Sequence, residues 1–372
     1  MTYESSGGPG RAHPIQALHE LGQSLWLDNI TRTLLVSGTL ERYIQDLLVT
    51  GLTSNPTIFE HAIGNGDSYD ASIRVLADAG MSDEDLFFEL ALEDLSEAAD
   101  LFRPIFDATD GIDGWVSLEV SPLLANNTSH TIHAANRLCE KATKANLFIK
   151  IPGTPQGLEA IEQVVFDGVP VNVTLLFSRE QALAAADAYL RGLERRLAAG
   201  LDLKVASVLS LFVSRWDVAA QQQMPSPFHN RLGIAVAMRT YKAHGELLVS
   251  ERWQRLAAAG AQPQRLLWAS TGTKDPAASD TLYVQALAAP GTIDTMPEKT
   301  LLAFADHGRV DGPMPTDGGY AEAVIEEFQR EGLDVCALAA RLQREGVDDF
   351  ATSWHALLTR IHQKRAAPRR SV

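Results

Sequence analysis

The sequence is poor in cysteine and has no long apolar run. Its two cysteines, Cys139 and Cys336, lie far apart and match no metal-binding or redox spacing. This usage is typical of a protein in a reducing cytoplasm, which is where we expect the chain to work. No apolar run approaches the ~20 residues of a membrane span, and residues 1–11 lack the hydrophobic core of a signal peptide. We therefore predict no membrane partner.

Positive charge is also scarce. The chain has 32 lysines and arginines against 47 aspartates and glutamates, which gives a formal net charge of -15. This balance argues against nucleic acid or an anionic membrane as a partner, so a phosphate ligand would need local positive contacts. We interpret the cluster of Arg191, Arg195 and Arg196 as a solvated helix face. Monomer and homodimer both stay open, because no self-complementary stripe stands out.

Several cofactor and metal motifs are missing. No Gly-x-Gly-x-x-Gly opens a helix, and no Gly-x-Ser-x-Gly elbow occurs. His130 and His133 are spaced for one helix face, but no third ligand follows at metal spacing. We therefore predict that the protein uses neither a metal nor a cofactor.

What the sequence does contain is a recurring order of short apolar runs, turn residues and helical stretches. Strand alternating with helix implies a parallel sheet, and eight such units imply a closed (β/α)8 TIM barrel. A doubly wound open sheet is the alternative, but the missing glycine motif disfavours it. The expected strands are 24–28, 51–55, 115–119, 147–151, 169–175, 205–211, 265–270 and, as the weakest pattern, 291–295.

Helical patterns lie between the expected strands and after them. Thr39 is a candidate cap for a helix over 40–48, and Ser82 with Asp85 marks the start of a long helix reaching Phe106. We expect one domain over 13–363, with a helical C-terminal extension from about 298, and flexible tails over 1–12 and 364–372. The remaining expected helices are 157–165, 179–198, 232–258, 281–288, 319–330, 334–345 and 348–363.

Lys150 is the most informative residue, because it interrupts the apolar run over 146–152. The chain has eight lysines, and none precedes Lys141. Removing an ammonium from water disfavours its charged form, and a neutral amine in a dry pocket is what Schiff-base chemistry with a carbonyl substrate requires. The alternative is a strand-end lysine whose head reaches solvent.

Polar side chains end or alternate within the other apolar runs. In a barrel, the carboxyl ends of the strands converge on the mouth that carries the chemistry. Period-2 alternation places Asn172 and Thr174 on one face, and together the set predicts an active site. Its members are Asp28, Asn55, Glu119, Lys150, Asn172, Thr174, Ser210 and Ser270.

Chemical type assigns roles to these residues. Lys150 is the candidate nucleophile, Glu119 with Thr174 the candidate proton shuttle through a water, and Asp28 the base for a substrate hydroxyl. Asn55, Asn172 and Ser210 would hold the substrate hydroxyls.

Each of these residues also has a purely structural interpretation. Asp28 could cap a helix near Thr31, Asn55 before Pro56 could be a turn asparagine, and Glu119 could be a rim carboxylate. Their joint placement favours the catalytic interpretation.

Four strings resemble the transaldolase family, in the family's order: GLTSNPTIF at 51–59, LFIKIP at 147–152, VNVTLLFS at 171–178 and SLFVSR at 210–215. The likeness runs from about residue 18 to about residue 297, and the longer helical C-terminus is similar to the long bacterial branch. The resemblance implies a metal-free class I aldolase-type barrel of the pentose phosphate pathway. Such an enzyme moves a dihydroxyacetone unit from sedoheptulose 7-phosphate to glyceraldehyde 3-phosphate, giving erythrose 4-phosphate and fructose 6-phosphate.

The family's functional residues fall on the positions identified above, with Lys150 as the Schiff-base lysine and Asp28 as the acid/base aspartate. The resemblance adds Arg215 as the phosphate-binding arginine. A second phosphate contact, Ser-Phe-Arg in many relatives, here reads Ser270-Thr271-Gly272-Thr273-Lys274, so Ser270 carries over and Lys274 is the candidate replacement for the arginine. The usual Ser-Pro-Phe is replaced by Ser-Leu-Phe at 210–212.

Other functions stay open alongside transfer. A fructose 6-phosphate aldolase type of cleavage would release free dihydroxyacetone, and motif spacing does not separate it from transfer. A non-catalytic sugar-phosphate-binding barrel needs no amine nucleophile, which disfavours it. A pyridoxal phosphate enzyme also forms a lysine Schiff base, but its glycine-rich phosphate cup does not stand out.

Overall fold

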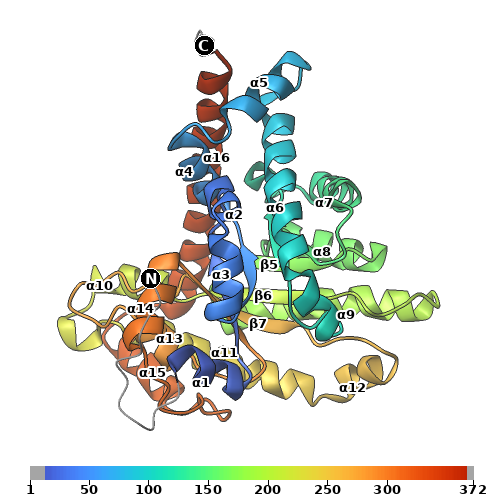
Figure 1. The fold of residues 1–372 in the computed structure, drawn as a ribbon. Helices are drawn as coiled ribbons and strands as arrows, with labels where there is room; N and C mark the ends of the chain where they lie inside the picture. Colours follow the sequence, from blue (N-terminus) through green and yellow to red (C-terminus); the bar gives the residue numbers. More distant parts are fainter. Residues whose placement is uncertain (1–12, 367–372) are drawn as a thin grey trace.

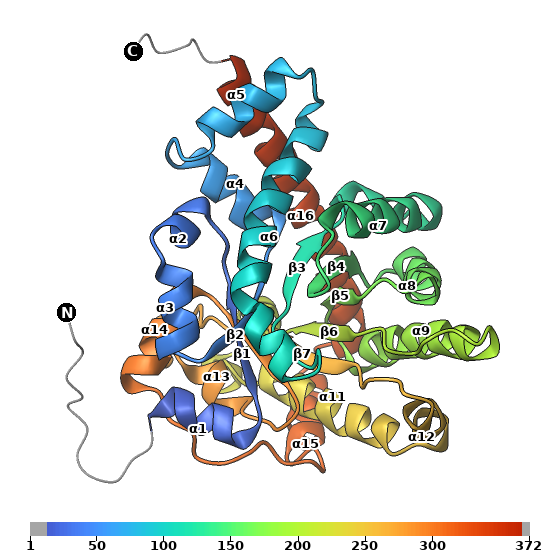
Figure 2. The same ribbon diagram turned by 45° about the vertical axis from the view of Figure 1, so that its right-hand side comes forward.

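The computed structural model describes residues 13–366 and shows a closed barrel of eight parallel strands in sequential order. Figures 1 and 2 show helices surrounding this barrel. The predicted (β/α)8 fold is therefore confirmed. The expected tail over 1–12 lies outside the described residues, as do residues 367–372 of the tail expected over 364–372. The strands are β1 (Ser24–Asp28), β2 (Val49–Thr53), β3 (Val116–Glu119), β4 (Leu147–Pro152), β5 (Val171–Leu176), β6 (Ser207–Phe212), β7 (Arg265–Ala269) and β8 (Ile293–Met296).

Helices lie between the strands and continue after β8. The first eight are α1 (Pro14–Leu21), α2 (Arg32–Val36), α3 (Thr39–Asp46), α4 (Pro56–Gly64), α5 (Asp70–Asp78), α6 (Asp83–Ala108), α7 (Thr128–Ala142) and α8 (Pro155–Asp167). The others are α9 (Arg179–Ala198), α10 (Ser214–Gln221), α11 (Leu232–Leu248), α12 (Glu251–Ala258), α13 (Leu282–Ala286), α14 (Glu298–His307), α15 (Ala321–Arg330) and α16 (Val335–Ala366).

Capping residues explain where several helices begin. Ser82 accepts a hydrogen bond from the Asp85 backbone N–H, as expected for the start of α6. The expected cap at Thr39 is wrong, because Thr39 is already helical and Gly38, with φ +67°, precedes it. The single helix expected over 232–258 is also wrong, because Ser250 caps a new helix, α12, through the Trp253 N–H.

The C-terminal region differs most from the prediction. One continuous helix, α16, replaces the two expected over 334–345 and 348–363, and Gly346 lies buried inside it. The helix also includes Lys364 and Arg365, which were expected in a tail without partners. Lys364 pairs with Asp70 at 2.5 Å and Arg365 with Asp83 at 3.1 Å, so these contacts fasten α16 to α5 and α6.

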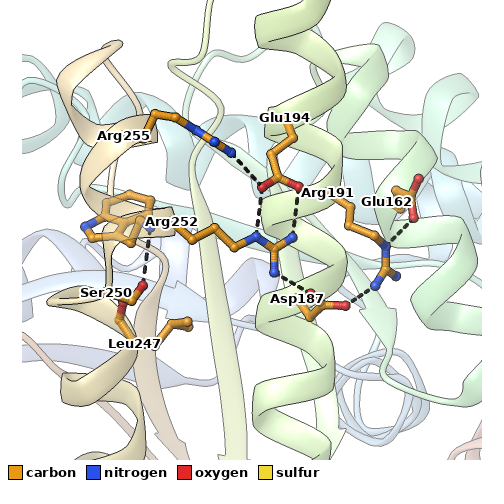
Figure 3. A network of polar contacts seen from close by, with 9 residues as sticks. Glu162, Asp187, Arg191, Glu194, Leu247, Ser250, Arg252 and Arg255 are labelled. Atoms are coloured by element: carbon orange, nitrogen blue, oxygen red, sulfur yellow. Dashed lines mark hydrogen bonds and ion pairs between the residues drawn. The ribbon is translucent and has the colours of Figure 1, made fainter.

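Ion pairs connect the helices on the outside of the barrel. Arg252 of α12 contacts Asp187 at 2.6 Å and Glu194 at 2.8 Å, both on α9 (Figure 3). Arg191 of α9 reaches Glu162 of α8 at 2.6 Å. Arg191 and Arg195 of α9 are partly exposed, as predicted, but both also pair with Glu162 of α8. They therefore connect two helices and do not form only a solvated face.

No helix within residues 13–366 combines the length and the apolar character that crossing a bilayer requires. Over the same range, no three His, Cys, Asp or Glu side chains gather as they would around a metal ion.

Candidate active site

The strand register brings Glu119, Lys150 and Asn172 into one row. In the β3–β4 pairing Glu119 lies opposite Lys150, and in the β4–β5 pairing Lys150 lies opposite Asn172. All three side chains are buried: Glu119 is the last residue of β3, Lys150 lies in the second half of β4, and Asn172 lies near the start of β5. The alternation of apolar and polar residues thus turns the three polar groups toward the same interior face.

Lys150 contacts groups from three other parts of the chain. Its Nζ lies 3.1 Å from Oε2 of Glu119, and the side chains of the pair are 6% and 3% exposed. Nζ also donates a hydrogen bond to the backbone oxygen of Ser54 at 3.1 Å. The ring of Phe350 lies over it, with the centroid 5.6 Å away. The alternative of a solvent-reaching lysine is therefore wrong.

Glu119 and Thr174 both hold unused hydrogen-bonding capacity. Oε2 of Glu119 is paired with Nζ of Lys150, whereas Oε1 of Glu119 and Oγ1 of Thr174 have no hydrogen-bond partner within residues 13–366. Burial raises the pKa of Glu119, and the charge of Lys150 partly opposes that rise. Buried polar atoms without protein partners are typical of sites that take up water or substrate, which fits the predicted proton shuttle.

Asp28 ends β1 and accepts a hydrogen bond from Oγ1 of Thr53 at 2.9 Å. Burial raises the pKa of Asp28, whereas the charges of Lys150 and Lys274 and the hydrogen bond from Thr53 act in the opposite direction. Asp28 is therefore within electrostatic reach of the amine. The alternative helix cap at α2 is provided by Thr31, whose side chain accepts from the Leu34 N–H.

Asn172 is the centre of a hydrogen-bonded chain inside the barrel. Ser210 donates to Oδ1 of Asn172 at 2.7 Å, and Nδ2 of Asn172 donates to Ser117 at 3.1 Å. Sequence reasoning identified Asn172 and Ser210 but missed Ser117, although its alternation with Glu119 in β3 was a usable signal.

Asn55 is the N-terminal cap of α4, a structural role of the kind that the sequence left open. Its Oδ1 accepts from the Ile58 N–H at 3.0 Å and caps α4. The side chain is partly buried and follows β2 at the mouth. Its oxygen caps the helix, whereas its amide nitrogen donates no hydrogen bond within residues 13–366.

Of the three predicted phosphate contacts, Arg215 lies in the first turn of α10, and Ser270 and Lys274 lie on the loop after β7. Ser270, at φ +58°, shares a 2.9 Å hydrogen bond with Ser214, which directly precedes Arg215 at the start of α10. Arg215 pairs with Asp349 of α16 at 2.8 Å. Lys274 is exposed, and its charge acts on Asp28, which places it near the mouth.

A closed (β/α)8 barrel that holds a buried lysine beside the carboxyl groups of Glu119 and Asp28 is the arrangement that a Schiff-base enzyme of the aldolase class requires. Residues 25–361 match the family model described as transaldolase/fructose-6-phosphate aldolase. The chain therefore belongs to the transaldolase/fructose-6-phosphate aldolase family and is an enzyme.

Similar proteins cover nearly the whole chain. A transaldolase from Thermobifida fusca (strain YX) is 44% identical over 95% of this chain and 99% of its own length. A transaldolase from Saccharopolyspora erythraea is 46% identical over 94% of this chain and 97% of its own length. A transaldolase from Thiobacillus denitrificans is 44% identical, with coverages of 92% and 97%.

Proposed function

We propose that the protein transfers a dihydroxyacetone unit between sugar phosphates through a Schiff base on Lys150. The donor is sedoheptulose 7-phosphate, the acceptor is glyceraldehyde 3-phosphate, and the products are erythrose 4-phosphate and fructose 6-phosphate. The observation that carries the proposal is the buried contact of 3.1 Å between Lys150 and Glu119 at the barrel mouth. Burial of this pair strengthens every electrostatic interaction around a reacting carbonyl.

The first half of the reaction uses Lys150, Glu119 and Asp28. The neutral amine of Lys150 adds to C2 of the ketose, and loss of water gives an iminium. Glu119, through a water held with Thr174, moves the protons of these steps. Asp28 then takes the proton of the C4 hydroxyl and the C3–C4 bond breaks. The electron pair of that bond is taken up by the iminium to leave an enamine, and the C4 oxygen becomes the aldehyde of erythrose 4-phosphate, which departs.

The second half reverses these events on a new aldehyde. The enamine carbon attacks C1 of glyceraldehyde 3-phosphate, and Asp28 returns its proton to the new alkoxide. Water then releases fructose 6-phosphate from the iminium. A raised pKa suits Asp28 for this exchange, because the carboxyl must hold a proton in one half and release it in the other.

Arg215, Ser270 and Lys274 are the proposed phosphate contacts, and Asn55, Asn172 and Ser210 the proposed hydroxyl contacts. The hydrogen bond between Ser214 and Ser270 supports a common anion site, because it joins the start of α10, which carries Arg215, to the loop that carries Lys274. We further infer that the enzyme works in the cytoplasm as a monomer or homodimer.

The test is to trap the covalent intermediate. The protein is incubated with fructose 6-phosphate, reduced with borohydride, digested and analysed by mass spectrometry. We expect a three-carbon adduct on Lys150 that is absent in Lys150→Met and present in Lys204→Met, a matched change at a surface lysine. An adduct on another lysine would contradict the assignment. Adding erythrose 4-phosphate as the acceptor, or omitting it, separates transfer, which gives sedoheptulose 7-phosphate, from release of free dihydroxyacetone.

A further inference from the structure

Gln343 of α16 connects the two strands that carry Lys150 and Thr174. Its Nε2 donates to the backbone oxygen of Gly153, just after β4, and to that of Leu175 in β5, both at 3.0 Å. The Gly153 N–H also donates to the Thr174 oxygen at 2.8 Å. One side chain from the C-terminal helix thus fastens the carboxyl ends of β4 and β5 together.

Strand β5 is irregular at this point. Leu175 has φ +57°, a left-handed conformation that is strained for a leucine. The β5–β6 register shifts between Val173 and Leu176, as it does at a β-bulge. Bulges re-aim side chains next to active sites, and the side chain next to this one is Thr174, whose buried Oγ1 has no partner within residues 13–366.

Helix α16 fits closely against the irregular residue. Gln343 and Gly346 lie one turn apart on the same face, and a Cβ at Gly346 would come within 2.9 Å of Cδ2 of Leu175. A strained backbone persists only where its surroundings hold it. Here the surroundings are the Gln343 hydrogen bond to the Leu175 oxygen and the close approach of the helix.

We propose that Gln343 is a positioning residue for proton transfer. It holds the bulge at Leu175 and thereby keeps Thr174 aimed at Glu119. This inference rests on the proposed function, because it assigns Glu119 and Thr174 the role of moving protons to and from the Lys150 adduct. Within residues 13–366 Gln343 makes no hydrogen bond to Lys150, so it would act through the backbone of Gly153, just after β4, and of Leu175 in β5.

The test compares two variants that lose the donor with one that keeps it. Gln343→Met preserves length and removes the amide, Gln343→Glu stays polar without the donor, and Gln343→Lys restores a donor of similar reach. Gln363→Met is the matched control, because Gln363 is an exposed glutamine on the same helix. Steady-state transfer from fructose 6-phosphate to erythrose 4-phosphate gives kcat and KM.

We expect kcat to fall at least ~10-fold in Gln343→Met and Gln343→Glu, because small misplacements of catalytic groups are costly. KM should stay within about twofold, since the substrate contacts lie elsewhere, and Gln343→Lys should recover most of kcat. Equal kcat in all variants would overturn the inference, as would a loss that Gln343→Lys does not repair. Borohydride trapping on Lys150 of the unmodified protein tests the proposed function separately, so the two failures are distinguishable.

Discussion

Lys150 is surrounded by groups of three chemical kinds: a carboxylate, a backbone carbonyl and an aromatic face. In the proposed mechanism a neutral amine attacks the ketone, so Lys150 must first pass a proton to a neighbouring group. Glu119, at 3.1 Å, is the nearest group able to accept that proton.

Replacing Glu119 therefore tests the proton path. In Glu119→Gln we expect kcat to fall about 10²- to 10⁴-fold, the range for loss of a general acid or base. Lys150 remains in place, so the borohydride-trapped adduct should still form, but more slowly. Quenched-flow trapping measures its rate, with the exposed Glu20→Gln as control. A kcat within fivefold of the unmodified enzyme would rule out this role.

Phe350 is the apolar cover of the same amine. Leucine at this position would keep the site apolar but remove the ring face, which is worth about 0.5–2 kcal/mol to a nearby cation. We expect Phe350→Leu to admit more water and to raise the ratio of free dihydroxyacetone to transferred product. An enzymatic assay of dihydroxyacetone measures this ratio, and Phe328→Leu, a buried change in α15, is the control. An unchanged ratio would show that the ring does not exclude water.

At the scale of the element, α16 contributes to the barrel mouth as well as to the fold. Figures 1 and 2 show it running beside α4 and past the barrel. Thr57 at the start of α4 donates to Ser353 at 2.8 Å, and Asp349 pairs with Arg215 at 2.8 Å. The arginine proposed to bind phosphate is therefore already paired with a carboxylate.

Removing that carboxylate should strengthen phosphate binding. In Asp349→Asn we expect KM for fructose 6-phosphate to fall about threefold, because phosphate no longer competes with Asp349 and is no longer repelled by it. The affinity for inorganic phosphate as a competitive inhibitor should rise by a similar factor. Asp348→Asn makes the same charge change at the neighbouring exposed residue. A higher KM would mean instead that Asp349 orients Arg215.

The sequence predicted elements well where the signal was local. The boundaries of β1 and α9 were correct at both ends, and the other seven strands differ by one or two residues. The pattern of apolar residues locates a strand, but its ends depend on which backbone groups find partners. Two helices were expected over 334–345 and 348–363, but Gly346 between them is buried within the continuous α16, where its missing side chain allows a close approach to Leu175.

The active-site residues likewise divide into those with a local sequence signal and those placed by long-range packing. Residues that end a strand, such as Lys150 and Glu119, could be predicted because the barrel brings strand ends together. Phe350, Asp349 and Gln343 could not be predicted, since they reach the mouth through long-range packing of α16. The bulge at Leu175 has no local signature either, because leucine disfavours the conformation that it adopts there.

At the scale of the molecule, buried carboxyl groups make stability depend on pH. Asp294 of β8 is fully buried and accepts a 2.7 Å hydrogen bond from Thr271. Burial raises its pKa from 3.8 to about 7. Between these values the folded chain holds a proton that the unfolded chain releases, so this contribution to stability is complete below pH 3.8 and is lost as the pH rises to 7.

Asp294→Asn should remove this dependence. The free energy of unfolding of the unmodified protein should fall relative to the variant by at most about 1.4 kcal/mol per pH unit in that window. Thermal unfolding of both proteins at pH 5 and pH 8 measures the effect, with the exposed Asp46→Asn as control. The variant should gain in relative stability at pH 8. A constant difference between the proteins at both pH values would contradict the raised pKa.

The place of α16 in the chain has a consequence for synthesis. A ribosome that has released β8 has released every strand of the barrel and every side chain proposed to touch substrate. The helix that covers Lys150 and fastens β4 to β5 has not yet emerged. Helix α16 packs against α4, which lies some 300 residues earlier in the sequence. Contacts between residues so far apart in sequence form slowly. We expect nascent chains to close the barrel first and to acquire activity only afterwards.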